Sequence, residues 1–492
     1  MTIICNRHKF QYEVECICKV FFPCTLFGHE YDTNDFDRDD LVITRLKKGG
    51  SHTFLLAVLK WNGKVYHAHR VVENNRAEKQ HCEEQLCTAL YEILTRATGV
   101  KVKWGIMTGV RPVKFMIYLM KQGMDAQSIR REFQERYLVS DQKISLMEKT
   151  ARNQIEILRS SRENSYSLYI SIPFCPSRCS YCSFVSSSIA GQKARKLIQP
   201  YVDRLCEELR YMAKMADTIG LRLESIYIGG GTPTTLSAEQ LKQLTDVVRE
   251  KLLCGTVREY TIEAGRADTI TREKLAVIAG AGATRISINP QTFNDEVLAI
   301  IGRKHTAQQV LDCYQMAREM GFEDINMDFI AGLPGDTPES FQHTIQLATE
   351  LAPTNITVHT LSLKRSSSLY TVDGLDERMK QVKTGEMVDY AYETLSQHGY
   401  EPYYLYRQKN TLHNLENVGY CKKGYEGLYN IFIMEERHTI LAAGAGGVTK
   451  LIRPGHDKVQ RIFNYKYPFE YLDGFSEILK RKEAVFTFYG KN

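Results

Sequence analysis

Residues 167–184 read SLYISIPFCPSRCSYCSF, a β-rich apolar run followed at once by three cysteines. Cys175, Cys179 and Cys182 have the spacing C-x3-C-x2-C and are predicted to lie on the loop that leaves a strand. A structural zinc site takes four ligands, usually in two separated pairs, and the next cysteine, Cys206, stands alone in a predicted helix. An iron–sulfur cluster also normally takes four thiolates. Three thiolates would hold three irons of a [4Fe–4S] cube and leave the fourth iron open to a substrate or cofactor.

The apolar run at 167–174 begins a repeating pattern that continues to residue 363. Short β-rich runs alternate with stretches that read as helices with polar faces, and Ser237 is the predicted N-cap of one helix. The predicted strands span 167–174, 224–231, 258–265, 284–291, 324–332 and 355–363. This alternation predicts a parallel sheet with right-handed crossovers. It favours a barrel or part-barrel over a flat doubly wound sheet, without deciding between them.

The 492-residue chain is long enough for two or three domains, and its pattern changes on both sides of this core. We expect an N-terminal extension domain over 1–163, the core over 164–370 and a C-terminal domain over 371–492. Helices outside the core are predicted at about 77–96, 141–158 and 378–397. The predicted fold class is α/β: a partial (β/α)6 barrel with an N-terminal α/β extension and a C-terminal α+β region packing on the barrel.

The composition is typical of a soluble globular protein, with 43% apolar and 25% charged residues. The net charge of +6 does not by itself indicate nucleic-acid binding. The N-terminus lacks the apolar core of a signal peptide, and no apolar run approaches the roughly 20 residues of a membrane span. The 13 cysteines favour free thiols and a metal site over a disulfide framework. We therefore expect a cytoplasmic protein without a membrane span.

Polar and glycine residues gather at the predicted carboxyl ends of several core strands. The second strand runs into GGGTPT at 229–234, where consecutive glycines would let a ligand approach the backbone closely. Glu263 and Gln291 follow at the ends of the third and fourth strands, and the fifth strand carries Asp328. Each residue taken alone is better explained as a strand-end residue facing solvent. Together they indicate a site at the edge where (β/α) barrels place their active sites.

The cysteine motif, with an aromatic residue at Tyr181 just before its last cysteine, resembles the signature of the radical S-adenosylmethionine (SAM) superfamily. The resemblance implies a [4Fe–4S] cluster held by Cys175, Cys179 and Cys182. It also implies that the amino and carboxylate groups of SAM chelate the open iron, and that an electron from the cluster cleaves SAM to a 5′-deoxyadenosyl radical.

Further motifs narrow the resemblance to one branch. The branch containing oxygen-independent coproporphyrinogen III dehydrogenase is similar over about residues 167–365, in YISIPFC, GGGTPT, IEAG, NPQTFND, GRKHT and NMDFIAGLPGDT. Its HemZ-type variant is similar also in the N-terminal extension, RPVK, YRQKN and ENVGY. The resemblance implies SAM contacts at Tyr169, Tyr181, Gly230, Gly231, Thr232, Glu263, Gln291, Arg303 and Asp328, with backbone contacts near Ser362 and Ala443.

The branch resemblance implies a function in porphyrin and haem biosynthesis. The reaction is oxidative decarboxylation of the propionates of coproporphyrinogen III to the vinyl groups of protoporphyrinogen IX, with an electron donor and a final acceptor that the sequence does not identify.

Two positions depart from the dehydrogenase pattern, because Phe184 replaces a further cysteine and Ser171 replaces a histidine. Phe184 instead matches the haem-chaperone-like members. The alternative is therefore a haem-binding or haem-transfer protein on the same scaffold. A third alternative, a cluster module that only binds partners, is disfavoured by the complete set of SAM-site residues.

An anionic tetrapyrrole substrate would need cations for its carboxylates. The candidates are Lys364, Arg365, Arg407 and Lys409, although such side chains are usually solvated. Tyr403, Tyr404 and Tyr406 either face the macrocycle or alternate along a late strand packed on the barrel, and the strand interpretation is preferred. The extension also holds six cysteines without a C-x2-C pair, so a second metal site there is disfavoured: Cys5, Cys16, Cys18, Cys24, Cys82 and Cys87.

Overall fold

The computed structural model describes residues 1–22, 25–33, 37–76, 78–184, 186–362, 364, 367–371, 383–408, 411, 414–453 and 458–490. Contacts between them divide the chain into two compact units. Unit 1 comprises Met1–Glu148 and Arg407–Glu416, and unit 2 comprises Lys149–Tyr406 and Asn417–Asn492. The first division falls inside helix α5 (Asp141–Ser160), which is the helix predicted at 141–158.

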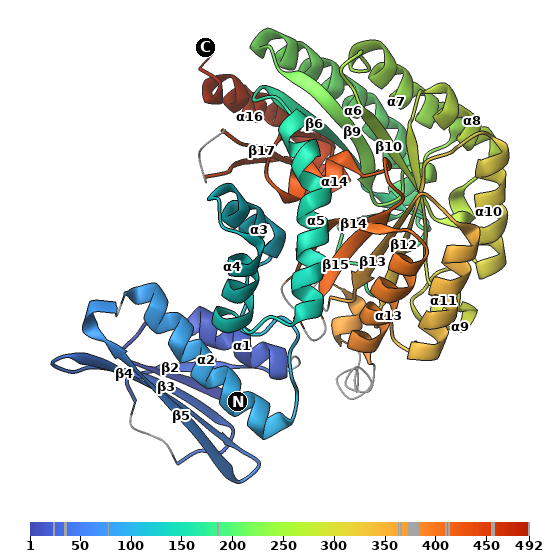
Figure 1. Cartoon of the computed structure of the whole chain (residues 1–492). Helices are drawn as coiled ribbons and strands as arrows, with labels where there is room; N and C mark the ends of the chain where they lie inside the picture. Colours follow the sequence, from blue (N-terminus) through green and yellow to red (C-terminus); the bar gives the residue numbers. More distant parts are fainter. Residues whose placement is uncertain are drawn as a thin grey trace. The chain divides into compact units, whose positions relative to one another are not determined.

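Unit 1 is built on a sheet that has five strands among the described residues, in the order β2-β1-β3-β4-β5 (Figure 1). The strands are β1 (Thr2–Asn6), β2 (Gly28–Tyr31), β3 (Leu41–Lys48), β4 (His52–Trp61) and β5 (Lys64–Glu73). The helices are α1 (Gln11–Phe21), α2 (Lys79–Thr98), α3 (Pro112–Lys121) and α4 (Ala126–Arg131). Apolar side chains of α1 and α2 pack with those of β1 and β4 in one buried cluster, so the extension is α/β as predicted.

The cysteines of unit 1 contribute to its core. Helix α2 matches the helix predicted at 77–96, and both of its cysteines, Cys82 and Cys87, are buried. Cys5 and Cys18 are buried in the same unit, and burial raises the pKa of each thiol. In the part of unit 1 that the structure describes, no three His, Cys, Asp or Glu side chains could hold a metal ion. These thiols are buried in apolar clusters, where cysteine packs as a small apolar group, and Cys24 lies outside the described residues.

The late segment Arg407–Glu416 belongs to unit 1 because its ends are bound there by buried polar contacts. Glu416 accepts hydrogen bonds from Trp104 Nε1 at 2.6 Å and from Lys143 Nζ at 2.5 Å. Burial opposes the charge of Glu416, but the Lys143 ammonium and the Trp104 N–H outweigh it and lower the pKa of the carboxyl. A buried ion pair thus fixes a segment remote in sequence.

Unit 2 is built on the larger sheet, in which the described residues form eleven strands in the order β14-β15-β13-β12-β11-β10-β9-β6-β16-β17-β18. The six strands predicted for the core are β6 (Ser165–Ile172), β9 (Arg222–Gly230), β10 (Glu259–Gly265), β11 (Arg285–Gln291), β12 (Ile325–Ala331) and β13 (Asn355–Thr360). Each of them is parallel to the next. The strand order has two ends, so the sheet is an open, partial barrel.

Helices cover the outer side of these parallel strands, and α6, α7, α8, α10 and α11 form the outer layer in Figure 1. The helices between the strands are α6 (Gln192–Ile219), α7 (Ala238–Lys251), α8 (Arg272–Gly280), α9 (Asp295–Ile300), α10 (Ala307–Glu319) and α11 (Pro338–Leu351). Ser237 is confirmed as the N-cap of α7, where it forms a capping box with Gln240. The outward strand side chains are apolar and buried, as at Ile228, Ile262 and Met327.

The inner side of the same strands is polar and only partly covered. Tyr227, Glu263 and Asp328 alternate with the buried apolar residues and remain partly exposed. Helix α14 (Leu428–Met434) supplies Tyr429, whose ring stacks on Tyr227 with the centroids 4.7 Å apart. A parallel sheet is normally apolar on both faces, so this polar inner face indicates a binding site.

The region after residue 371 extends the barrel sheet. Its strands are β14 (Glu401–Arg407), β15 (Glu416–Cys421), β16 (Thr439–Ala443), β17 (Val448–Leu451) and β18 (Gln460–Phe463). Its further helices are α13 (Thr384–Gln397), α15 (Pro468–Asp473) and α16 (Phe475–Phe488). Strand β15 is antiparallel to β13, and β16 is parallel to β6. Residues 378–382 of the helix predicted at 378–397 lie outside the described residues.

These units differ from the domains expected at 1–163, 164–370 and 371–492. The difference arises because the late strands complete the ladders at both ends of the barrel sheet instead of forming a sheet of their own. No helix in the described ranges has the length and apolar character needed to cross a membrane.

A buried ion pair joins α16 to α6, with Lys482 Nζ 3.0 Å from Glu208 Oε1 and both side chains almost inaccessible. We expect Lys482→Met to lower the free energy of unfolding by about 3–5 kcal/mol, because it leaves an uncompensated buried carboxylate. Chemical denaturation measures this loss. The control Arg159→Met removes an exposed ion pair with Glu156 and should cost less than about 1 kcal/mol. Equal losses would contradict the prediction.

Candidate functional site

The three cysteines follow β6 at the carboxyl edge of the parallel sheet, in the segment 175–182, here called the cysteine loop. Cys175 ends the two-residue strand β7 (Phe174–Cys175), and Cys179 and Cys182 come after it. Cys179 is buried, whereas Cys175 and Cys182 are partly exposed. Burial raises the pKa of Cys175 and of Cys182, and the neighbouring thiols act in the same direction. Both are therefore neutral thiols at pH 7 unless a metal displaces their protons.

The described side chains include no three His, Cys, Asp or Glu residues that converge on one metal ion. A cubane cluster binds each thiolate on a different iron, so its ligands need not converge in this way. Single-ion zinc geometry is thus not found, and a loop with three separate thiols is compatible with a cluster.

The glycine strip (residues 229–231) lies at the end of β9 and packs directly against the cysteine loop. Gly231 N donates to Ile172 O at 2.7 Å, and Thr232 Oγ1 lies 3.6 Å from Cys175 Sγ. A Cβ on Gly231 would come within 3.0 Å of that sulfur and 2.5 Å of Phe174 O. Gly230 has φ of 111°, which side chains rarely adopt. The strip therefore needs glycine for this close approach.

Glu263 and two tyrosines form the next part of the inner face. Tyr227 Oη donates to Glu263 Oε1 at 2.6 Å, and the Tyr169 ring stacks on Tyr227 with a centroid distance of 6.2 Å. Burial raises the pKa of Glu263 to about 8, with a smaller contribution from the negative charge of Asp328. The carboxyl is therefore largely protonated at pH 7. A cation bound beside it would favour loss of that proton.

Asp328 lies on β12 within the same polar face. It accepts a hydrogen bond from Asn326 Nδ2 at 2.8 Å, and His359 Nε2 lies 3.9 Å from the same Oδ1. Burial opposes the charge of Asp328, but His359 and hydrogen bonds outweigh it and lower the pKa. Two carboxyl groups of one face thus differ in protonation, with Asp328 ionised and Glu263 neutral.

Arg303 lies behind the aromatic residue of the cysteine motif. Its Nη2 donates to Tyr181 Oη at 3.0 Å, and its Nη1 donates to Asn289 O at 3.2 Å. Its buried Nε has no hydrogen-bond acceptor among the described residues. A buried donor without a partner is costly, so this N–H is available to an anionic or carbonyl group of a ligand.

The remaining predicted contacts occupy three further strand ends. Gln291 ends β11 with φ of 73° and is buried, and such a conformation in a residue other than glycine is a form of strain found at functional sites. Ala443 ends β16 and pairs in register with Ile170 of β6. Ser362 follows β13 and is partly exposed. Most predicted positions thus lie on the inner face or at the carboxyl ends of the sheet's strands, whereas Tyr181 lies on the cysteine loop and Arg303 between α9 and α10.

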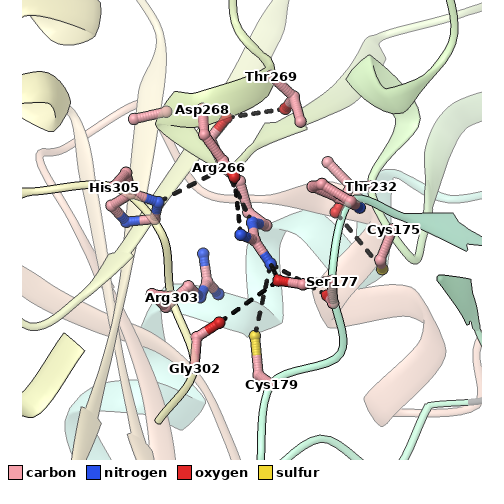
Figure 2. A network of polar contacts seen from close by, with 12 residues as sticks. Cys175, Ser177, Cys179, Thr232, Arg266, Asp268, Thr269, Gly302, Arg303 and His305 are labelled. Atoms are coloured by element: carbon pink, nitrogen blue, oxygen red, sulfur yellow. Dashed lines mark hydrogen bonds and ion pairs between the residues drawn. The ribbon is translucent and has the colours of Figure 1, made fainter. Parts of the chain in front are cut away.

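Some neighbours of the cysteines are not among the residues predicted from the sequence. Arg266 follows β10, and its guanidinium binds both carboxylate oxygens of Asp268, at 2.9 and 2.8 Å. In Figure 2 the same side chain points toward Ser177 and Cys179 of the cysteine loop. His305 lies on the far side of Asp268, with Nδ1 3.6 Å from Oδ1. The strand-end rule that selected Glu263 also applies to Arg266 and was the available signal.

The cations proposed to bind substrate carboxylates differ in their exposure and in their hydrogen-bond partners. Arg407 is buried in unit 1, where it binds the carbonyl oxygens of Met107 and Asn414 and lies 4.8 Å from the Trp104 ring centroid. Burial lowers the pKa of Arg407 to about 10. Its prediction as a substrate cation is wrong, because its N–H groups are already bound. Lys364 is partly exposed, whereas Arg365 and Lys409 lie outside the described residues.

The aromatic run 401–407 forms β14, as the strand interpretation predicts. Tyr403 and Tyr404 are buried in an apolar cluster with Cys421 and Ile431, and Tyr406 packs against that cluster. These rings are therefore core residues of unit 2 rather than a platform for a macrocycle.

The raised pKa of Glu263 predicts a pH-dependent effect of Glu263→Gln. The unfolded chain ionises near the ordinary value of 4.5, whereas the folded protein keeps the proton up to about pH 8. Native stability due to this group therefore falls as pH rises between these values, by at most about 1.36 kcal/mol per pKa unit. Glutamine removes this penalty, so thermal unfolding should show a stabilising effect that grows from pH 5 to pH 8. A difference independent of pH would contradict the assignment.

Comparison with known proteins identifies the superfamily. Residues 169–348 match the family model of the radical SAM superfamily, which uses a [4Fe–4S] cluster and SAM. The residues at the carboxyl edge fit these groups. Three thiols lie on one loop, a glycine backbone approaches them, and the Arg303 Nε donor is unpaired among the described residues.

Three relatives place the chain more closely. HemZ of Bacillus subtilis, an oxygen-independent coproporphyrinogen-III oxidase-like protein, is 36% identical over 464 residues, which cover 91% of each chain. The haem chaperone HemW of the same species is 33% identical over 57% of this chain and 70% of its own. Oxygen-independent coproporphyrinogen III oxidase of Salmonella typhimurium is 34% identical over 40% of this chain and 42% of its own. This chain therefore belongs to the radical SAM superfamily, in the oxygen-independent coproporphyrinogen-III oxidase-like family of HemZ.

Proposed function

We propose that this protein decarboxylates the propionate side chains of coproporphyrinogen III to vinyl groups, giving protoporphyrinogen IX without oxygen. The observation that carries the proposal is the match to HemZ over 91% of both chains, which includes the N-terminal extension as well as the barrel. The match to the chaperone HemW covers 57% of this chain. The full-length relative thus favours the oxidase-like activity.

Cys175, Cys179 and Cys182 are the proposed ligands of the cluster. When bound, the cluster and SAM supply the radical that removes hydrogen from the substrate. The chain's own contribution is to orient the ligands and exclude water. The Gly231 backbone and the Thr232 hydroxyl lie against Cys175, so they limit how far that side of the loop can move.

The inner face would bind SAM, a cation that carries an ammonium, a carboxylate and ribose hydroxyls. Glu263 and Asp328 supply acceptors for its ammonium and hydroxyl groups. The Arg303 Nε, which has no acceptor among the described residues, supplies a donor for its carboxylate. Tyr169, Tyr181, Gly230, Gly231, Thr232, Gln291, Ser362 and Ala443 are the other proposed contacts. Tyr181 lies on the cysteine loop, and the places of the others on the inner face and at the strand ends support this assignment.

The open edges of the sheet favour a large substrate, because a partial barrel is less enclosed than a closed one. Lys364 remains the proposed cation for a substrate carboxylate. The reaction also needs a one-electron donor and a final electron acceptor. We propose a cytoplasmic location, where thiols stay reduced.

Haem binding or transfer is the second candidate. It is favoured by the HemW match and by Phe184, which is 63% exposed directly after the cysteine motif. Ser171 carries less weight, because its hydroxyl is buried and donates to Ala445 O at 2.8 Å. That hydroxyl is thus satisfied within the protein.

The ligand assignment predicts that Cys175→Ala, Cys179→Ala and Cys182→Ala each abolish the cluster, because two thiolates cannot replace three. Iron and sulfide analysis after anaerobic reconstitution measures this loss. The control variants Cys206→Ala and Cys313→Ala remove buried thiols elsewhere in unit 2 and should retain full iron content. A complete cluster in Cys179→Ala would refute the assignment.

The function itself is tested by an assay pair on the reconstituted protein under anaerobic conditions. After dithionite has reduced the cluster, addition of SAM, coproporphyrinogen III and a one-electron acceptor should give protoporphyrinogen IX, and 5′-deoxyadenosine should form in step with it. Cys179→Ala should form neither product. A haem titration separates the second candidate, since a chaperone would bind haem stoichiometrically and leave coproporphyrinogen III unchanged. That second pattern would overturn the proposed oxidase activity.

A further inference from the structure

A buried arginine in the turn after β10 contacts the cysteine loop. Arg266 is 3% exposed. Its Nη1 lies 2.9 Å from Ser177 Oγ, 3.1 Å from Ser177 O and 3.9 Å from Cys179 Sγ (Figure 2). One guanidinium nitrogen thus faces both the loop backbone and the sulfur of its central cysteine.

The other side of the guanidinium is fixed by Asp268. Nε and Nη2 form a bidentate pair with its two carboxylate oxygens, at 2.9 and 2.8 Å. This fork geometry orients Nη1 toward the loop, because the planar guanidinium is rigid. His305, buried with Nδ1 3.6 Å from Asp268 Oδ1, limits movement of the carboxylate. The chain therefore builds a three-residue support for one N–H that faces Cys179.

This support is more elaborate than loop anchoring requires. The loop is already held on another side, where Ser180 N donates to Ile301 O at 3.0 Å. A neutral hydrogen-bond donor would hold Ser177 without the cost of burying a charge. The positive charge and its orientation toward sulfur need a separate explanation.

We infer that Arg266 is a positioning residue that holds the cysteine loop and makes the cluster easier to reduce, by placing a cationic N–H beside the Cys179 thiolate. Cluster potentials depend on nearby charge, hydrogen bonds to the sulfurs and solvent exposure. A buried cation is weakly screened, so it stabilises the extra negative charge of the reduced cluster. The inference rests on the ligand assignment proposed above.

Two variants test the inference by the sign of their effects. Arg266→Gln removes the cation, and we expect the midpoint potential of the cluster to fall by about 59 mV or more, a tenfold change for one electron. Asp268→Asn keeps Arg266 and removes its compensating anion, so the potential should rise, by a smaller amount because Asp268 lies behind Arg266. Redox titration with dithionite, followed by electron paramagnetic resonance, measures both shifts.

The matched control is Arg272→Gln, which removes an exposed arginine from the first turn of α8, where it pairs with Glu319 at 3.0 Å. Its potential should equal that of the wild type. Loosening of the loop alone would move both test variants in the same direction, and that result, or no shift, would overturn the inference. If the Arg266→Gln protein fails to hold a cluster, the inference is tested by Asp268→Asn alone. An unchanged or lowered midpoint potential of the Asp268→Asn protein then refutes the inference.

The outcome is separable from failure of the proposed function. Iron content of the wild type and of the cysteine variants tests the ligand assignment, and potentials are compared only between proteins with full iron content. Suppose that Arg266→Gln and Asp268→Asn shift the potential in the expected opposite directions, but the wild type leaves coproporphyrinogen III unchanged. This result would support the role of Arg266 and refute the proposed substrate.

Discussion

The parallel pairing of β6, β9, β10, β11, β12 and β13 constrains the whole candidate site, because strands that run the same way end at one edge. The cysteine loop, the glycine strip and the turn that carries Arg266 each follow one of these strands. The strand pairing brings them to one edge, and contacts such as those of Thr232 with Cys175 and of Arg266 with Ser177 then join them. Alternation along the strands then sends apolar side chains to the helices and polar ones to the inner face. Position in the site is thus a consequence of strand order.

The two ends of the sheet differ in how far their charged side chains are paired with one another. At the amino ends, Arg285 pairs with Asp324 at 2.8 Å and with Glu259 at 3.2 Å, so the charges compensate one another within the protein. At the carboxyl edge, Glu263 is held by a tyrosine hydroxyl rather than by a cation. Arg303 keeps a buried N–H without an acceptor among the described residues. Incomplete compensation at one end is typical of a site completed by its ligand.

The sequence was sufficient for the parts of the fold that depend on local patterns. The six core strands, the α2 face with Cys82 and Cys87, and the Ser237 cap all follow from alternation, helical periodicity or capping chemistry. Pairing between distant segments leaves no such local signal. Nothing near Thr439–Ala443 shows that this strand will lie beside β6.

In the candidate site, too, residues with a local sequence signal were predicted, whereas those that depend on tertiary contacts were not. Strand-end position identified Glu263, Gln291 and Asp328, and the cysteine spacing identified the loop. Arg407 was misjudged because its partners are carbonyl oxygens of residues such as Met107, far away in the sequence. A cation in a loop and a cation buried against such carbonyls have the same sequence appearance. Only the tertiary structure separates them.

The segment Arg407–Glu416 belongs to unit 1 although it lies between two stretches of unit 2 in the sequence. The chain enters unit 1 twice, so the extension is not a detachable leading module. Deletion of residues 1–148 would remove Trp104 and Lys143, and the Glu416 carboxylate at the start of β15 would lose both of these partners. The barrel unit and the extension are therefore joined by the backbone at more than one point, so a cut after Glu148 would not separate two intact units.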